Sequence, residues 1–184
     1  MLLTLALFSF NLSAYELPRV VPLADAALGV QPISITAVVN PRSPGGVHDF
    51  SSEGDYWWPD PKNPAGPYVR RDGETNPSNF VAHRRLMFAF ARDVGALTAA
   101  YDLTREERYA AAAVQQLRVW FVDPATRLNP NLQYAQSIQG VCTGRGIGLI
   151  DTVHLAEVAL GLRALHGAKP LDAATEAAAH AWFR

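Results

Sequence analysis

The segment Leu86–Tyr101, with the sequence LMFAFARDVGALTAAY, indicates the fold class more clearly than any other part of the chain. Its large apolar residues recur at spacings of four, four, three and four, as they do on one face of an α-helix. The residues of this face are Leu86, Phe90, Val94, Leu97 and Tyr101. Such a face is normally buried against other elements. The segment therefore predicts an amphipathic helix that starts after Asn76–Pro77 and belongs to a helical domain.

A second helix is expected after a short break at Asp102–Leu103. Thr104, followed three residues later by Glu107, is typical of a capping box that starts a helix. One face of this helix carries Tyr109, Ala113, Leu117 and Trp120. Asp123–Pro124 is expected to end it, because the residue before a proline disfavours helical backbone.

The segment 147–166 has apolar residues on two sides and predicts a helix enclosed by neighbours. One stripe comprises Ile147, Leu155, Val158, Leu162 and Leu165, and the opposite one comprises Leu149, Ile150, Val153 and Leu160. A last helix is expected over residues 173–184, with Asp172 as its cap. Together these segments predict an all-α chain of antiparallel helical hairpins with long ordered loops.

The loop before the helices is dense in aromatic residues. Residues 53–61 read EGDYWWPDP, and two of the chain's four tryptophans are adjacent there. The nearby prolines and glycines exclude a long helix or a central strand. Flat aromatic faces beside Arg and Asp side chains suit a sugar ring, so the loop predicts a carbohydrate-binding surface. The alternative is an ordered loop whose aromatic side chains fill the helical core.

Composition excludes several functional classes. The net charge of -1 gives no general attraction to nucleic acid or to a polyanion, so anion binding must come from local arginines and Lys62. The single cysteine, Cys142, excludes an internal disulfide. Histidines and carboxylates show no metal-ligand spacing, and we expect neither a metal nor another cofactor. We also expect no nucleic-acid partner.

The first fourteen residues, 1–14, are mostly apolar and uncharged, and we expect them to be a signal peptide. The stretch is too short to span a bilayer as a helix, which needs about 20 residues. The lack of an early Lys or Arg and the presence of Leu12 are atypical of a signal peptide. The alternative is a disordered or packed N-terminal segment. A signal peptide predicts a periplasmic or secreted protein, with no membrane contact after its removal.

Two blocks of sequence resemble the alginate lyase family of bacterial polysaccharide lyases. The first is DYWWPDP at 55–61 with PYVRRDGETNP at 67–77, and the second is TRLNPNLQYAQ at 126–136 with TGRGIGLIDT at 143–152. The resemblance covers about residues 20–184 and implies an α/α toroid. The final helix reaches Arg184 without a capping residue. We therefore expect residues 15–184 to be the N-terminal part of an incomplete toroid domain that continues beyond the chain.

The resemblance implies cleavage of alginate or a related polyuronate by β-elimination. This reaction needs neutralisation of the uronate carboxylate, a base for the C5 proton and an acid for the departing oxygen. The family uses an Asn-His pair, an Arg and a Tyr for these tasks. The five histidines of this chain follow Val47, Ala82, Val153, Leu165 and Ala179, so none follows an asparagine. The catalytic residues are therefore unknown and are expected beyond Arg184.

This leaves candidates for gripping an anionic polysaccharide. We expect an aromatic platform, carboxylate-binding arginines and polar groups for sugar hydroxyls. These are Tyr56, Trp57 and Trp58 for the platform, Arg70 and Arg145 for carboxylates, and Asn131, Tyr134 and Gln136 for hydroxyls. The competing interpretations are a buried ion pair of Arg145 with Asp151 or Glu157, and loop-to-loop hydrogen bonds for Tyr134 and Gln136.

Other readings of the sequence stay open. One is a non-catalytic carbohydrate-binding protein on the same helical scaffold. Another is a glycoside hydrolase, which would need paired carboxylates, and the pairs Asp55/Asp60 and Asp72/Glu74 are its candidates. Among the histidines, we expect His154 in the core and His83 on a solvated helix face.

Overall fold

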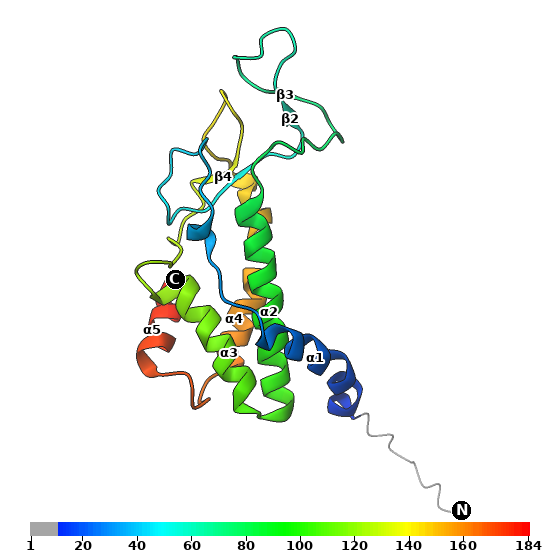
Figure 1. Cartoon of the computed structure of the whole chain (residues 1–184), viewed down its shortest axis with the longest axis vertical. Helices are drawn as coiled ribbons and strands as arrows, with labels where there is room; N and C mark the ends of the chain where they lie inside the picture. The colour runs from blue at the N-terminus through cyan, green and yellow to red at the C-terminus, as the bar shows by residue number, and fades with distance from the viewer. Residues whose placement is uncertain (1–10) are drawn as a thin grey trace, which may run out of the picture.

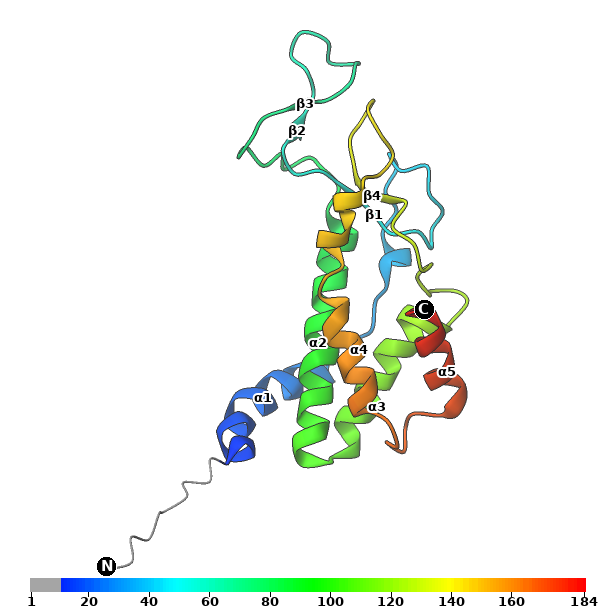
Figure 2. The ribbon, with the colours of Figure 1, turned by 180° about the vertical axis from the view of Figure 1, so that it is seen from behind.

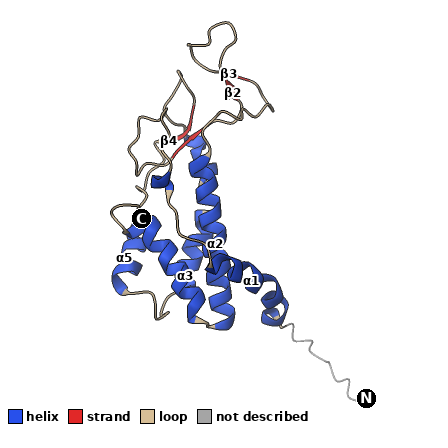
Figure 3. Ribbon diagram, viewed as in Figure 1, coloured by secondary structure: helices blue, strands red, loops and turns tan. Residues whose placement is uncertain are grey.

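The computed structural model describes residues 11–184 and shows an elongated molecule with helices at one end and loops at the other (Figure 1). Its α-helices are α1 (Leu12–Leu28), α2 (Ala82–Thr104), α3 (Glu107–Leu117), α4 (Leu155–Ala164) and α5 (Ala173–Trp182). Its strands are β1 (Ser51–Glu53), β2 (Trp57–Trp58), β3 (Val69–Arg70) and β4 (Tyr134–Ser137). The prediction of a mainly helical chain is confirmed. The short strands are an addition that the sequence patterns did not predict (Figure 3).

Helix α2 is the central element of the fold. Helices α1, α3 and α4 all pack against it. Figure 2 shows α4 running alongside α2. The predicted apolar face is confirmed, since Phe90, Val94, Leu97 and Tyr101 are buried. The ring of Phe90 stacks on that of Trp120, with centroids 4.3 Å apart. This face therefore organises the core.

The loop end is built from two short strand pairs. Strand β1 runs parallel to β4, although they are far apart in the sequence, and β2 runs antiparallel to β3. The β1–β4 pair lies beside the N-terminal end of α2 (Figure 2). The pair fixes residues from separate loops at that end of α2.

The predicted capping box is wrong. Helix α2 continues through Thr104, Arg105 takes a left-handed conformation with φ 59°, and α3 begins at Glu107 with Glu106 as its N-cap. The Thr104 hydroxyl instead donates to the Ala100 carbonyl and accepts from the Glu106 amide. The turn therefore depends on the left-handed residue, which the sequence pattern did not reveal.

The predicted continuous helix over 147–166 is also wrong. A 3₁₀ helix, η3 (Gly146–Asp151), is followed by a turn and then by α4. A Cβ added to Gly148 would lie 2.4 Å from the Ala135 side chain, so η3 sits directly against β4. Val158, Leu162 and Leu165 of the first predicted stripe are buried, whereas Ile147 of that stripe is exposed, as are all four residues of the opposite stripe, Leu149, Ile150, Val153 and Leu160.

The structure describes the N-terminal segment only from Asn11 and the C-terminal segment as far as Arg184. Residues 1–10 of the expected signal peptide lie outside the described residues, and Leu12–Ala14 form the first turn of α1, so that prediction stays open. No helix within residues 11–184 is both long enough and apolar enough to cross a membrane. Near the other end, Trp182 and Phe183 pack against Phe121, so both rings have partners inside the chain.

The expectations for the two histidines are wrong. His154 is exposed and touches the edge of Phe88. His83 is 3% exposed, because the loop carrying Val38 and strand β1 cover it. Its Nδ1 accepts from the Ser51 amide at 3.1 Å, and its Nε2 lies 2.7 Å from the Val38 carbonyl. These contacts require a neutral ring with the proton on Nε2.

His83 therefore predicts a pH-dependent stability. Burial lowers the pKa of His83 below its ordinary value of 6.5, so the unfolded chain binds this proton more readily than the folded chain does. The contribution of His83 to stability is complete above about pH 6.5 and is lost as the pH falls below that value. We expect the urea midpoint to decrease between about pH 7 and pH 5 in the wild type and to decrease less in His83→Gln. Equal decreases would show that His83 is not the sensitive group.

Candidate functional site

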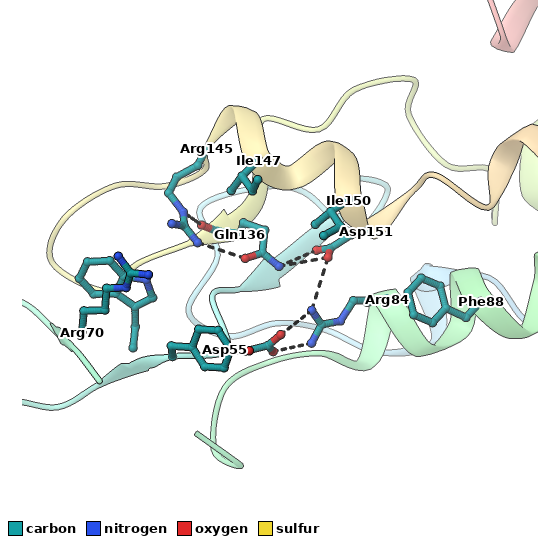
Figure 4. Close-up of a pocket in the computed structure, with 11 residues that line it drawn as sticks. Asp55, Arg70, Arg84, Phe88, Gln136, Arg145, Ile147, Ile150 and Asp151 are labelled. Carbon is teal, nitrogen blue, oxygen red and sulfur yellow. Dashed lines mark hydrogen bonds and ion pairs between the residues drawn. The ribbon is translucent and has the colours of Figure 1, made fainter. Parts of the chain in front are cut away.

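A cavity of about 510 Å³ lies at the loop end of α2 and gathers residues from four parts of the chain. The first wall carries Asp55, Tyr56, Trp57 and Arg70, from β2, β3 and the residues before β2. Arg84 and Phe88 of α2 form the base, and Gln136, Arg145, Ile147, Ile150 and Asp151 come from β4, η3 and the loop between them (Figure 4). Five of the eight predicted binding residues are thus brought together: Tyr56, Trp57, Arg70, Gln136 and Arg145.

The geometry of the β2–β3 pair explains why Trp57 and Arg70 share the cavity while Trp58 is outside it. Trp57 is directly opposite Arg70 in the antiparallel register, and opposite residues share one face of a strand pair. Adjacent residues on a strand point to opposite faces, so Trp58 points away. Its indole donates to the Glu74 carbonyl at 2.8 Å, and the Arg71 guanidinium lies over its ring. The three aromatic residues therefore do not form one platform.

Asn131 and Tyr134 also lie outside the cavity. The Asn131 amide donates to Asp49 Oδ1 at 3.1 Å. The Tyr134 ring packs against Gly45, where an added Cβ would come within 2.5 Å of it. Asn131 therefore hydrogen-bonds to another loop, and the Tyr134 ring packs against another loop.

Asp151 is the most buried polar group of the site, with 1% of its surface exposed. Its carboxylate accepts from the Ser52 hydroxyl at 2.5 Å and from Gln136 Nε2 at 3.0 and 3.1 Å. Arg84 Nη1 lies 3.4 Å from its Oδ1. A buried carboxylate is tolerated only when it is paired and hydrogen-bonded in this way. Asp151 therefore joins η3 to β1, β4 and α2.

Arg84 is the cation that lies beside Asp151, and the sequence did not predict this pairing. Its two terminal nitrogens donate to the two oxygens of Asp55 at 3.0 and 2.5 Å. Hydrogen bonding to Asp55 raises the pKa of Arg84, and the charge of Asp151 adds to the effect. Because two carboxylates surround it, the charge of Arg84 is compensated within the protein.

Arg145 is in a different electrostatic situation. Its Nε donates to the Gln136 backbone carbonyl at 2.7 Å, and its Nη2 donates to Gln136 Oε1 at 3.1 Å. Within residues 11–184, no carboxylate lies within ion-pair distance of its guanidinium. The proposed pairs with Asp151 and Glu157 do not form. Arg145 therefore brings to the cavity a positive charge that is uncompensated in the sense that no carboxylate of residues 11–184 pairs with it directly.

Two neighbours define the position of the Arg145 guanidinium. Its central carbon is 5.9 Å from the centre of the Trp57 ring. A Cβ added to Gly54 would lie 2.7 Å from Nη2, so the glycine gives the side chain room to pass. The guanidinium thus lies over one face of the Trp57 ring, and both groups line the cavity.

Arg70 supplies a second and weaker positive charge. It pairs with Asp72 at 2.9 Å, but both side chains are exposed, at 61% and 75%. An exposed pair contributes little and is screened by salt, so a ligand carboxylate can replace Asp72. Arg70 and Arg145 together suit a ligand with carboxylates and a ring face.

The cavity does not favour the hydrolase reading. Asp55 lines it but is bound to Arg84, whereas Asp60, Asp72 and Glu74 are not among its lining residues. Neither predicted carboxylate pair therefore faces the cavity. In the part of the chain that the structure describes, no group of histidine, cysteine and acidic residues is arranged to hold a metal ion.

The contrast between the two arginines predicts different effects on folding. Arg84→Gln leaves Asp151 and Asp55 without their cation, and we expect it to lower the free energy of unfolding by about 3 kcal/mol. Arg145→Gln removes donors only from the neutral oxygens of Gln136, and we expect a loss of about 1 kcal/mol or less. Urea unfolding of both variants checks this. Equal losses would contradict the assignment of Arg84 to structure and Arg145 to binding.

Comparisons with known proteins bear on the family and the fold of the chain. A family profile described as alginate lyase matches residues 34–184. A crystal structure of an alginate lyase from Bacteroides ovatus superposes with a TM-score of 0.84 and 34% sequence identity. The match covers 92% of this chain and 46% of that structure, so the chain spans about half the length of its relative. No curated protein matches at a significant level. The resemblance predicted from the sequence is confirmed, and the chain belongs to the alginate lyase family.

Proposed function

We propose that this chain supplies the substrate-binding part of a polysaccharide lyase that cleaves alginate or a related polyuronate by β-elimination. The observation that carries the proposal is the uncompensated Arg145 guanidinium beside Trp57 in the cavity. A uronate ring has a carboxylate for the arginine and a face for the indole. Family membership supplies the reaction class.

The arrangement addresses one requirement of the reaction directly. Removal of the C5 proton becomes easier when a cation neutralises the neighbouring carboxylate, and Arg145 is suited to this task. The base and the acid are proposed to be an Asn-His pair and a tyrosine encoded beyond Arg184, with a further arginine. The absence of an Asn-His dipeptide from residues 1–184 and the greater length of the solved relative support this division.

The exposed apolar residues of η3 and α4 support a larger helical domain. Leu149 is 70% exposed, Val153 61% and Leu160 62%, and Ile147 and Ile150 are exposed as well, so residues 147–160 carry five large exposed apolar side chains. Soluble proteins rarely expose contiguous apolar surface of this kind without a partner. We infer that further helices cover it and complete an α/α toroid, with residues 15–184 as the N-terminal part.

The cellular setting of this function is also a proposal. Residues 1–14 would act as a signal peptide, and the mature protein would meet anionic polysaccharide in the periplasm or outside the cell. It would have no nucleic-acid partner and no membrane contact after removal of the signal.

A second candidate function is non-catalytic carbohydrate binding. It is favoured by the fact that the binding geometry is present in a chain without the Asn-His motif. Sequencing the gene past the codon for Arg184 separates the two candidates. An Asn-His dipeptide followed by Arg and Tyr favours the lyase, and its absence favours the binding protein.

Binding by the purified chain tests the proposal. We expect the wild type to bind a mannuronate oligosaccharide, as measured by calorimetry, and to produce no unsaturated sugar absorbing in the ultraviolet. Trp57→Ala should weaken binding about tenfold, because ring stacking is lost, while Trp58→Ala, the matched control outside the cavity, should change it less than about twofold. Equal effects of the two substitutions would contradict the assigned cavity.

The two cavity arginines should respond differently to salt. Arg70 is exposed and already paired, so the effect of Arg70→Gln on oligosaccharide binding should nearly disappear at about 0.5 M salt. Arg145 is half-buried, and the effect of Arg145→Gln should persist, at roughly tenfold or more. Calorimetry at low and high salt checks this. Loss of both effects at high salt would show that Arg145 acts only as a screened surface charge.

A further inference from the structure

Gln136 connects the buried anion of the site to its uncompensated cation. It lies on β4, is 7% exposed, and has Asp151 on one side and Arg145 on the other (Figure 4). Its Nε2 donates to both oxygens of Asp151, at 3.0 and 3.1 Å. Its Oε1 accepts from Arg145 Nη2 at 3.1 Å. Both ends of this amide are therefore engaged inside the protein.

The two neighbours determine which way the amide points. A carboxylate only accepts hydrogen bonds, and a guanidinium only donates them. If the amide were reversed, its NH₂ group would face the Arg145 donors and its oxygen would face the Asp151 oxygens. Asp151 thus fixes the orientation of Gln136, and Gln136 in turn presents an acceptor to Arg145.

The backbone of Gln136 completes the arrangement. This residue has φ 55°, a left-handed conformation that non-glycine residues rarely adopt and that is often found at functional sites. In this conformation its N–H donates to the Ser52 hydroxyl at 2.8 Å, and its carbonyl accepts from Arg145 Nε at 2.7 Å. One residue therefore holds the guanidinium at two points, through one backbone oxygen and one side-chain oxygen.

The acceptors that hold Arg145 are neutral oxygens, so they leave its positive charge available for a ligand. A carboxylate in the place of the Gln136 amide would orient the guanidinium but would also cancel its charge. The Gln136 side chain lies between Asp151 and Arg145, and Asp151 has Arg84 as its cation. The guanidinium is thus fixed in place while its charge stays available.

We propose that Gln136 and Asp151 are positioning residues that hold Arg145 as an uncompensated cation for a substrate carboxylate. The substrate contacts Arg145, and the Gln136 amide stays on Asp151. This differs from a role of Gln136 in binding sugar hydroxyls. The inference rests on the proposed function for the identity of the ligand, a uronate, but the positioning of Arg145 can be tested without any ligand.

The first experiment measures hydrogen exchange of the Arg145 Nε–H by nitrogen-15 NMR, with the signal assigned from its absence in Arg145→Lys. We expect slow exchange in the wild type, because this hydrogen bonds to the Gln136 carbonyl. Gln136→Gly permits the left-handed backbone and keeps the carbonyl that accepts from Nε, but it removes the side-chain oxygen that accepts from Nη2. The guanidinium is then held at one point instead of two, so the Nε–H bond should open more often and exchange should become at least about tenfold faster. Gln133→Gly, in the same loop and exposed, is the matched control and should leave exchange unchanged.

Asp151→Asn tests the more distant member of the relay. This substitution puts an NH₂ group in place of one of the two carboxylate oxygens that accept from Gln136 Nε2, and an NH₂ group cannot accept from it. Gln136 is then held by one acceptor instead of two, so its direction is less firmly fixed. Exchange at Arg145 should again become faster. Unchanged exchange in both Gln136→Gly and Asp151→Asn, with both proteins folded by circular dichroism, would overturn the positioning role.

The second experiment measures binding of a mannuronate trisaccharide and of a neutral mannose trisaccharide. Gln136→Gly should weaken binding of the charged sugar about tenfold, and Gln136→Glu should weaken it further because the new carboxylate pairs with Arg145. Gln133→Glu adds the same charge outside the cavity and should have less than about twofold effect. Binding of the neutral sugar should not change among these proteins.

The outcomes separate the two claims. If the wild type binds no mannuronate, the proposed function fails, while the exchange experiment still decides whether Gln136 and Asp151 position Arg145. If the wild type binds mannuronate and Gln136→Glu behaves like Gln133→Glu, the charge-preserving role of Gln136 is overturned. If Gln136→Glu is too unstable to measure, Gln136→Gly decides the same question through the selectivity for the charged over the neutral trisaccharide.

Discussion

The buried carboxylate of Asp151 is the group on which the rest of the site depends. Transfer of an unpaired carboxylate from water into a protein interior is very unfavourable, so its donors must be in place for the chain to fold in this way. These donors are Ser52, Arg84 and Gln136, which come from β1, α2 and β4. These contacts bring β1, β4 and η3, which are remote from one another in the sequence, together at the N-terminal end of α2.

The same carboxylate divides the positive charges of the site into two kinds. Arg84 is placed between Asp55 and Asp151, where it serves to hold the structure together. Arg145 is left with the neutral oxygens of Gln136 and faces the cavity with Trp57. A protein with a net charge of -1 can in this way offer a local cation to a polyanion. Family membership and the cavity therefore support the same class of ligand.

Sequence reasoning succeeded where a feature depends on local spacing. The face of α2 was predictable because apolar residues at helical period must be buried together, and the structure buries Phe90, Val94 and Leu97. Trp57, Arg70 and Arg145 could be proposed for binding because aromatic and cationic residues cluster in loops rich in glycine and proline. The alginate lyase resemblance followed from two such loops.

Sequence reasoning failed where a feature depends on a distant partner. The contacts between Arg84 and Asp151, which are 67 positions apart, and between His83 and the Val38 loop have no local pattern. The 3₁₀ segment before α4 lies against β4, with Gly148 close to Ala135, and this contact too is between segments apart in the sequence. Trp58 was misplaced for a different reason, since the strand that alternates Trp57 and Trp58 is too short to recognise.

The most direct test of this account is a crystal structure of the chain with a bound mannuronate trisaccharide. The account predicts a uronate carboxylate within hydrogen-bond distance of the Arg145 guanidinium, a sugar ring against Trp57, and an amide of Gln136 still directed at Asp151. A trisaccharide bound elsewhere, or one held by a Gln136 amide that has left Asp151 while Arg145 makes no contact, would contradict it.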